Sequence, residues 1–281
     1  MVNYNLITGC GSAWLERLVR DQEVPGSNPG TPTINHLGEI MRYGIFSDVH
    51  SNLEALEAVL EAFKNESIEK YLCVGDIVGY GADPIECIRI LRQLNPVMVC
   101  GNHDWATVDL FDKKWFNQYA EKAVTWTQSV LSDEDKDFLK SLELTKQIDG
   151  LGLVHGTLDN PAMFKYVFDL FEAEVCLEES LDHICFIGHT HRPVIFFMKG
   201  QEVNYILDNQ VYIQDGTRYL INVGSVGQPR DGNPYACYCV YDSVTRLFQI
   251  KRIAYDVHKA QEKILNAGLP HMFADRLPQG R

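Results

Sequence analysis

The chain has 281 residues, a net charge of −13, an apolar fraction of 46% and a charged fraction of 22%. These proportions are ordinary for a globular protein with one large α/β domain or two small ones. The negative charge repels nucleic acid and anionic membranes over most of the surface, so an anionic substrate needs a local positive centre such as bound metal ions.

Two further features narrow the class of protein. No run approaches the roughly 18 apolar residues that span a bilayer, so we expect no membrane contact. The eight cysteines include no Cys-x-x-Cys pair. This pattern favours reduced, structural thiols in a cytoplasmic protein.

Residues 1–40 differ from the rest because they lack sustained hydrophobic periodicity. The segment 13–30, which contains Gly26-Ser27-Asn28-Pro29, resembles a transfer-RNA gene translated as protein, and Gly38-Glu39-Ile40 matches a translated ribosome-binding site. We therefore expect residues 1–40 to be a non-native or disordered N-terminal extension, Met41 to be the true start, and 41–281 to be a single domain. A genuine flexible extension is the alternative.

From Met41 onward, strands and helices alternate. Apolar runs predict strands at 42–46, 70–74 and 97–100, and helical spacing of apolar residues predicts helices at 53–65 and 83–94, the latter capped by Asp83. This alternation predicts parallel strands joined by right-handed crossovers. We expect helix over 105–142, a hairpin of 145–148 with 151–154, and a helix near 172–181. Further strands are predicted at 183–187, 194–198, 203–207, 210–213, 219–223, 236–241 and 246–253, before a helix at 256–267.

Side chains that commonly bind metals follow five of the predicted strands. They are Asp48 and His50, Asp76, Asn102 to Asp104, His155, and His189 with His191. Strand ends of α/β sheets are where ligands bind, and five of the chain's nine histidines fall in this set. Mixed carboxylate, amide and imidazole donors suit Mn²⁺, Fe or Zn²⁺. The pattern predicts a two-metal centre that binds a phosphate and activates a bridging hydroxide.

These blocks resemble the five signature blocks of the calcineurin-like metallophosphoesterase superfamily, in the same order. They are Asp48-Val49-His50, Gly75-Asp76, Gly101-Asn102-His103-Asp104, Val154-His155-Gly156 and Gly188-His189-Thr190-His191. Downstream, 222–230 and 267–270 resemble its small prokaryotic phosphodiesterase branch. The resemblance implies the metallo-dependent phosphatase fold, a four-layer α/β/β/α sandwich of two mixed sheets.

The resemblance also implies a role for each residue. One metal ion would be bound by Asp48, His50 and His191, the other by Asn102, His155 and His189, with Asp76 bridging them. His103 would be the general acid that protonates the leaving oxygen as the bridging hydroxide attacks phosphorus, and Asp104 would orient it. Arg192 and Arg230 are candidates for phosphate contacts. Two divalent ions are implied, with Mn the first choice and Fe, Zn or Ni the alternatives.

The function we expect is metal-dependent hydrolysis of a phosphodiester or phosphomonoester in a small phosphorylated substrate, for which a nucleotide is one candidate. The segment 75–81 lacks the arginine found at this position in protein phosphatases of the superfamily, which favours a small substrate. A nuclease is a second hypothesis, but the acidic composition makes nucleic acid an unfavourable partner. A protein-interaction scaffold of the same fold is a third, and the complete ligand set argues against it. A homo-oligomer is compatible with the sequence.

Overall fold

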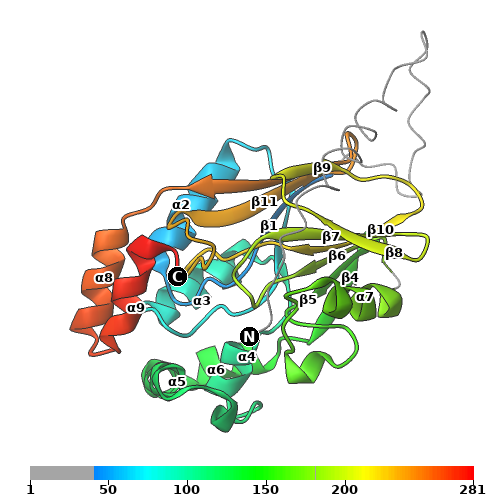
Figure 1. Cartoon of the computed structure of the whole chain (residues 1–281). Helices are drawn as coiled ribbons and strands as arrows, with labels where there is room; N and C mark the ends of the chain where they lie inside the picture. Colours follow the sequence, from blue (N-terminus) through cyan, green and yellow to red (C-terminus); the bar gives the residue numbers. More distant parts are fainter. Residues whose placement is uncertain (1–40, 181) are drawn as a thin grey trace, which may run out of the picture. The chain divides into compact units, whose positions relative to one another are not determined.

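Two mixed sheets of six strands each are formed by the residues that the structure describes, 41–180 and 182–281 (Figure 1). The structure is a computed structural model. In spatial order, the first sheet consists of β3 (Val97–Met98), β2 (Lys70–Cys73), β1 (Arg42–Phe46), β11 (Ala236–Asp242), β12 (Leu247–Ile253) and β9 (Gln210–Tyr212). The second consists of β4 (Thr145–Ile148), β5 (Leu151–Val154), β6 (Ile184–Ile187), β10 (Thr217–Asn222), β7 (Val194–Lys199) and β8 (Glu202–Ile206).

Helices cover the outer faces of the sheets and one end of the strands. The α-helices are α2 (Leu53–Lys64), α3 (Pro84–Leu94), α4 (Asn102–Thr107), α5 (Gln118–Val130), α6 (Asp133–Lys140), α7 (Leu170–Glu179), α8 (Val257–Asn266) and α9 (His271–Arg276). Short 3₁₀ turns lie at Lys113–Trp115, Pro161–Met163 and Leu277–Gln279.

Strand direction determines where the loops gather. In the first sheet, β1 is parallel to β2 and β2 is parallel to β3, as the strand–helix alternation predicted. In the second sheet, β6 is parallel to both β5 and β10. The predicted hairpin of β4 with β5 is also present. Each sheet therefore has a set of parallel strands whose carboxyl ends share an edge, which is where ligands bind in α/β proteins.

Alternating side chains give each sheet two apolar faces. In β1, Tyr43 and Ile45 lie in the core between the sheets, whereas Phe46 packs in the core that includes α2 and α3. In β6, Phe186 lies in the core between the sheets, whereas Cys185 faces the core that includes α7. Helices, sheet, sheet and helix thus follow one another, and the predicted four-layer α/β/β/α sandwich is confirmed.

The segment 105–142 is helical, as predicted, but it is divided into several elements. It consists of the end of α4, a 3₁₀ turn, α5 and α6. Asn117 begins α5, since its side chain accepts hydrogen bonds from the backbone N–H groups of Tyr119 and Ala120. Ser132 caps α6, since its side chain accepts a hydrogen bond from the Asp135 backbone N–H. The two caps interrupt the helix because each satisfies backbone donors that a continuous helix would bond internally.

Two further expectations are corrected. The third strand ends at Met98 rather than Cys100, because the chain beyond it forms only an isolated bridge to Glu143. Asp83 precedes α3, but its side chain makes no capping hydrogen bond and instead forms an ion pair with Lys263, with Nζ 2.9 Å from Oδ2. The predictions for residues 1–40 lie outside the described residues. Within the described ranges, no helix is long and apolar enough to cross a membrane.

Candidate metal centre

The sequence-predicted ligands meet where the parallel strands of both sheets end. Asp48 and His50 follow β1, and Asp76 follows β2. Asn102 is the first residue of α4, directly after the third strand. The second sheet contributes His155 after β5, and His189 and His191 after β6. All of these side chains are buried.

The backbone at this edge is strained in an unusual way. Five of the predicted ligands have left-handed backbone conformations, with φ of 53° at Asp48, 49° at His50, 51° at Asp76, 69° at His189 and 58° at His191. Such conformations cost non-glycine residues roughly 1–3 kcal/mol each and cluster at functional sites.

Hydrogen bonds between loops hold this backbone in place. The Asp48 carbonyl accepts from the Ser225 hydroxyl and from the Gly227 N–H, both at 2.9 Å. At the end of β10, the Asn222 amide donates to the Gly188 carbonyl at 2.6 Å. The loop after β10 therefore supports the ligand loops after β1 and β6. This explains why the segment 222–230 carries a recognisable pattern without supplying a predicted metal ligand.

Three groups of donor atoms are close enough to share a cation. In each group, one donor atom from each residue lies within 4.8 Å of the others. The groups are Asp48, His50 and His191; His50, Asp76 and His103; and Asp76, His155 and His189. Asp76 belongs to two groups, and its Oδ2 lies 3.2 Å from His155 Nε2 and 3.6 Å from His50 Nε2. Asp76 thus lies within reach of the donor atoms of both groups.

The imidazole rings are oriented as metal ligands are. The Nδ1 atoms of three rings lie against backbone carbonyls: His50 against Val78 at 3.1 Å, His155 against Val74 at 2.7 Å, and His191 against Gln228 at 2.5 Å. A carbonyl only accepts hydrogen bonds, so each Nδ1 carries a proton, and each Nε2 faces the site and can bind a cation once it is deprotonated. The Nε2 atoms of His50 and His191 lie 3.0 Å apart.

Buried polar atoms without hydrogen-bond partners indicate that this site can bind cations. Asn102 Oδ1 and His155 Nε2 are buried without a hydrogen-bond partner. Buried polar atoms are normally satisfied, so such atoms need an explanation. A metal ion at each position would satisfy them. The carboxylate, amide and imidazole groups gathered here therefore suit the binding of divalent metal ions.

The two carboxylates are ionised. Burial alone would raise the pKa of each, but positive charge on neighbouring histidines outweighs burial and lowers it. For Asp48 the main partner is His191, and for Asp76 it is His155. Burial likewise lowers the pKa of His155, but Asp76 overrides it and raises that pKa to about 9. For His50 and His189, burial dominates and lowers the pKa well below its ordinary value.

Gly101 allows two of these groups to approach closely. A Cβ atom at this position would lie 2.0 Å from Asp76 Oδ1, a distance that no side chain tolerates. The same Asp76 oxygen accepts a 2.9 Å hydrogen bond from the His103 backbone N–H. Glycine is therefore required here for close packing rather than for an unusual φ.

His103 is surrounded by aromatic rings. Its ring centroid lies 4.4 Å from Tyr80, 4.8 Å from Phe116 and 4.9 Å from His50. The side chain is buried, and its Nδ1 has no hydrogen-bond partner. Burial lowers the pKa of His103 to about 4. The structure places the predicted acid beside the metal ligands, and the donor groups also make it a competing ligand together with His50 and Asp76.

Asp104 does not contact the His103 ring as the sequence suggested. Its Oδ1 accepts hydrogen bonds from the backbone N–H groups of Ile77 and Val78, at 2.9 and 3.1 Å, and its Oδ2 accepts from Gly101 at 2.9 Å. Burial, reinforced by the charge of Asp76, raises the pKa of Asp104 to about 7. Asp104 therefore fixes the backbone on both sides of the site and positions His103 only through the main chain.

The two predicted phosphate-binding arginines differ in their surroundings. Arg192 is exposed, and its Nε donates to the Arg230 carbonyl at 2.9 Å. Arg230 is half-buried, and its backbone N–H donates to the His191 carbonyl at 3.2 Å. The Arg230 guanidinium lies over the Tyr80 ring, with Cζ 5.5 Å from the centroid. Arg230 is thus the arginine closer to the ligands.

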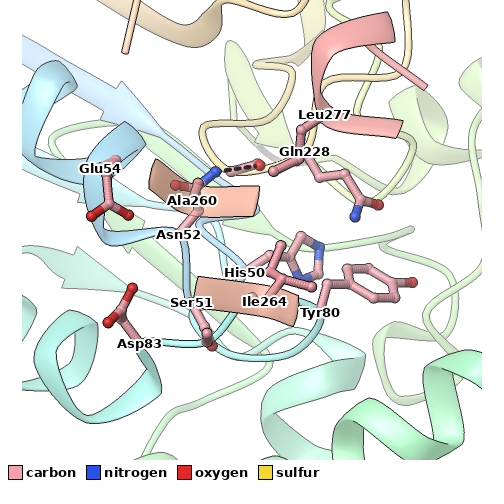
Figure 2. A pocket seen from close by; sticks show the side chains of 13 residues that line it. His50, Ser51, Asn52, Glu54, Tyr80, Asp83, Gln228, Ala260, Ile264 and Leu277 are labelled. Carbon is pink, nitrogen blue, oxygen red and sulfur yellow. Dashed lines mark hydrogen bonds between the residues drawn. The ribbon is translucent and has the colours of Figure 1, made fainter. Parts of the chain in front are cut away.

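A small pocket lies beside His50, and Figure 2 shows the side chains that line it. The Asn52 amide donates to the Gly227 carbonyl at 2.8 Å, the dashed line in the figure. Tyr80 and Gln228 extend on the His50 side, whereas Glu54 and Asp83 lie away from it. The two carboxylates pair with Lys263 of α8, the helix whose Ala260 and Ile264 line the pocket.

Sequence reasoning missed three groups at the site. Tyr80 contacts both His50 and His103, and the Tyr166 ring stacks on His189 with centroids 3.9 Å apart and planes 12° apart. Arg276, from α9, donates a hydrogen bond to Gln228 Oε1, and Arg230 donates to the same oxygen. Tyr80 stood in the segment already compared with protein phosphatases, but neither Tyr166 nor Arg276 belongs to a block with metal-ligand spacing.

Comparisons with known proteins agree with this geometry. The profile of the calcineurin-like phosphoesterase superfamily domain matches residues 41–246. A protein of Methanocaldococcus jannaschii, the uncharacterized MJ0912, is 40% identical over 242 residues, which are 84% of this chain and 97% of that protein.

Solved structures share the fold. A metallophosphoesterase from Sphaerobacter thermophilus superposes with a TM-score of 0.76 at 34% identity, covering 86% of this chain and all (100%) of that one. The hypothetical protein PH1004 from Pyrococcus horikoshii OT3 has a TM-score of 0.71 at 20% identity, covering 86% and 99% of the two chains, and supports the fold alone. By its sequence and by its architecture, the chain belongs to the calcineurin-like phosphoesterase superfamily.

Proposed function

We propose that this protein hydrolyses phosphoester bonds in a small phosphorylated compound, using two divalent cations. The observation that supports this most is the arrangement of buried donors around Asp76, with one group formed with His155 and His189 and a neighbouring group around Asp48. Bound there, the cations would supply positive charge to the phosphoryl oxygens and lower the pKa of a water molecule. Manganese is our first choice of metal.

The protein's own residues prepare the site for this chemistry. Asp48, His50 and His191 would bind one cation, Asn102, His155 and His189 the other, and Asp76 both. Carbonyls on the Nδ1 side fix the rings, and the strained loops fix the carboxylates. Preorganisation of this kind avoids reorganisation during the reaction. Arg230, on the His191 side, would contact a phosphate group of the substrate.

His103 is the proposed proton donor to the leaving oxygen. A buried imidazole whose pKa is about 4 is mostly neutral in the free protein. An anionic phosphate beside the ring favours its charged form and raises that pKa. The proton donor is therefore prepared by substrate binding rather than present beforehand. A positioned acid of this kind is typically worth about 10²–10⁴-fold in rate.

The test is an assay of the full chain with Mn²⁺ against bis(4-nitrophenyl) phosphate and 4-nitrophenyl phosphate. We expect turnover of at least one, with kcat in His103→Ala reduced about 10²-fold or more and metal content unchanged. His258→Ala is the matched control, since the His258 side chain is 81% exposed on α8. No turnover of either ester by a protein with confirmed metal would refute the proposal. Loss of metal in His103→Ala would instead make His103 a ligand.

A further inference from the structure

Two arginines converge on one neutral acceptor beside the metal centre. Arg230 Nη2 donates to Gln228 Oε1 at 2.9 Å, and Arg276 Nη1 donates to the same oxygen at 3.2 Å. Arg230 lies in the loop after β10, whereas Arg276 is the last residue of α9, 46 positions further on. Neither arginine is fully exposed, and Gln228 is only 2% exposed. Long-range folding therefore brings two positive charges to one point.

No carboxylate balances these charges. Among the ion pairs of residues 41–180 and 182–281, none involves Arg230 or Arg276. The guanidinium group stays protonated in proteins, so the like charges repel across a partly desolvated space. Burial and the charge of Arg230 lower the pKa of Arg276. A structural cross-link between α9 and the loop needs only one arginine, and the second charge only adds repulsion.

Arg230 also has unused hydrogen-bonding capacity. Arg230 Nε is buried and has no hydrogen-bond partner. The Arg230 guanidinium lies over Tyr80, whose ring is 4.4 Å from His103 and 4.5 Å from His50. Figure 2 shows Gln228 and Tyr80 on the side of the pocket where His50 lies. The Tyr80 ring therefore separates the Arg230 guanidinium from the proposed acid, His103, and from the predicted ligand His50.

We propose that Arg230 and Arg276, bridged by Gln228, form a subsite for a second phosphate group, so that the preferred substrate carries a phosphate in addition to the phosphoester that is cleaved. A dianionic phosphate matches two guanidinium charges, whereas a carboxylate matches only one. This inference rests on the proposed phosphoesterase function and specifies its substrate class. It adds Arg276 as a specificity-determining residue.

The test compares two esters that differ by one phosphate. Thymidine 5′-(4-nitrophenyl phosphate) has a single phosphodiester, and its 3′-phosphorylated form adds the second group. We expect the Mn²⁺-loaded full chain to have the higher kcat/KM for the doubly phosphorylated ester. In Arg276→Gln the ratio of the two kcat/KM values should fall by about 10–100-fold, the usual effect of losing a charge-assisted hydrogen bond. Arg276→Lys, which keeps the charge but loses the planar fork, should lie between.

Arg92→Gln is the matched control, because Arg92 is an exposed arginine of α3 paired with Glu134. An unchanged ratio in Arg276→Gln, or an equal loss for both esters with a lower unfolding temperature, would show that Arg276 only anchors α9 and would overturn the proposal. Calorimetry with inorganic phosphate and pyrophosphate separates this subsite from turnover. If neither ester is cleaved but wild type prefers pyrophosphate and Arg276→Gln does not, the subsite stands and the hydrolase function fails. A wild type with no preference in either assay overturns the subsite.

Discussion

Gly79 leaves room for the His103 ring, so filling that room tests whether the position of the ring matters. A Cβ atom at Gly79 would lie 2.4 Å from His103 Nδ1, whereas ordinary contact begins near 3.4 Å. Gly79→Ala would therefore displace the ring by about 1 Å, and a displacement of that size costs a catalytic group about 10²-fold in rate. Tenfold corresponds to about 1.4 kcal/mol, so the loss is about 2.7 kcal/mol of transition-state stabilisation.

Gly150→Ala is the matched control. Both glycines have positive φ, +98° at Gly79 and +77° at Gly150, but a Cβ at Gly150 meets nothing within 4 Å. Each alanine should therefore cost about 1–2 kcal/mol of stability from backbone strain. Only Gly79→Ala should lose kcat toward the aryl ester, with metal content equal in both variants. A kcat within threefold of the Gly150→Ala value would refute the proposed placement of His103.

Three further predictions concern the neighbours of the site. Tyr166→Ala should weaken Mn²⁺ binding about 10-fold, measured by calorimetry, because the imidazole on which Tyr166 stacks loses its support, while Tyr166→Phe should not. Asp76→Asn should lower metal content measured by mass spectrometry, whereas Asp104→Asn should keep the metal and lose about 1–3 kcal/mol of stability, since it holds backbone amides. Lys263→Met should cost about 1–2 kcal/mol at pH 7, because Lys263 Nζ lies 2.6 Å from Glu54. Burial would raise the pKa of Glu54, but the lysine pairs lower it below 4.5, so this stabilisation is present above pH 4.5 and lost as pH falls. Urea midpoints of wild type and Lys263→Met should therefore converge as the pH falls below 4.5, and a constant gap would contradict the assignment.

The sequence predicted those parts of the molecule that depend on local pattern. The strand ends that carry Asp48, Asp76 and His155 follow from short apolar runs and the polar residues after them. Parallel pairing of the first strands follows from their alternation with helices. These features need no knowledge of distant contacts.

Features that depend on distant parts of the chain could not be predicted in this way. Gln228 binds Arg230 locally and Arg276 across 48 positions, and only the packing of α9 creates that contact. Tyr166 has no signal in its own segment, because its partner, His189, lies beyond α7 and β6. The sequence suggested that Asp104 orients the neighbouring His103 ring. Its carboxylate instead accepts hydrogen bonds from backbone N–H groups of the loop after β2.

We expect two cations to lie among these ligands and to share Asp76. Anomalous diffraction at the manganese edge, from crystals grown with Mn²⁺, tests this most directly. Two peaks are expected, one next to Asp48, His50 and His191 and the other next to Asn102, His155 and His189, with Asp76 reaching both. A single peak, or a peak coordinated by His103, would contradict it.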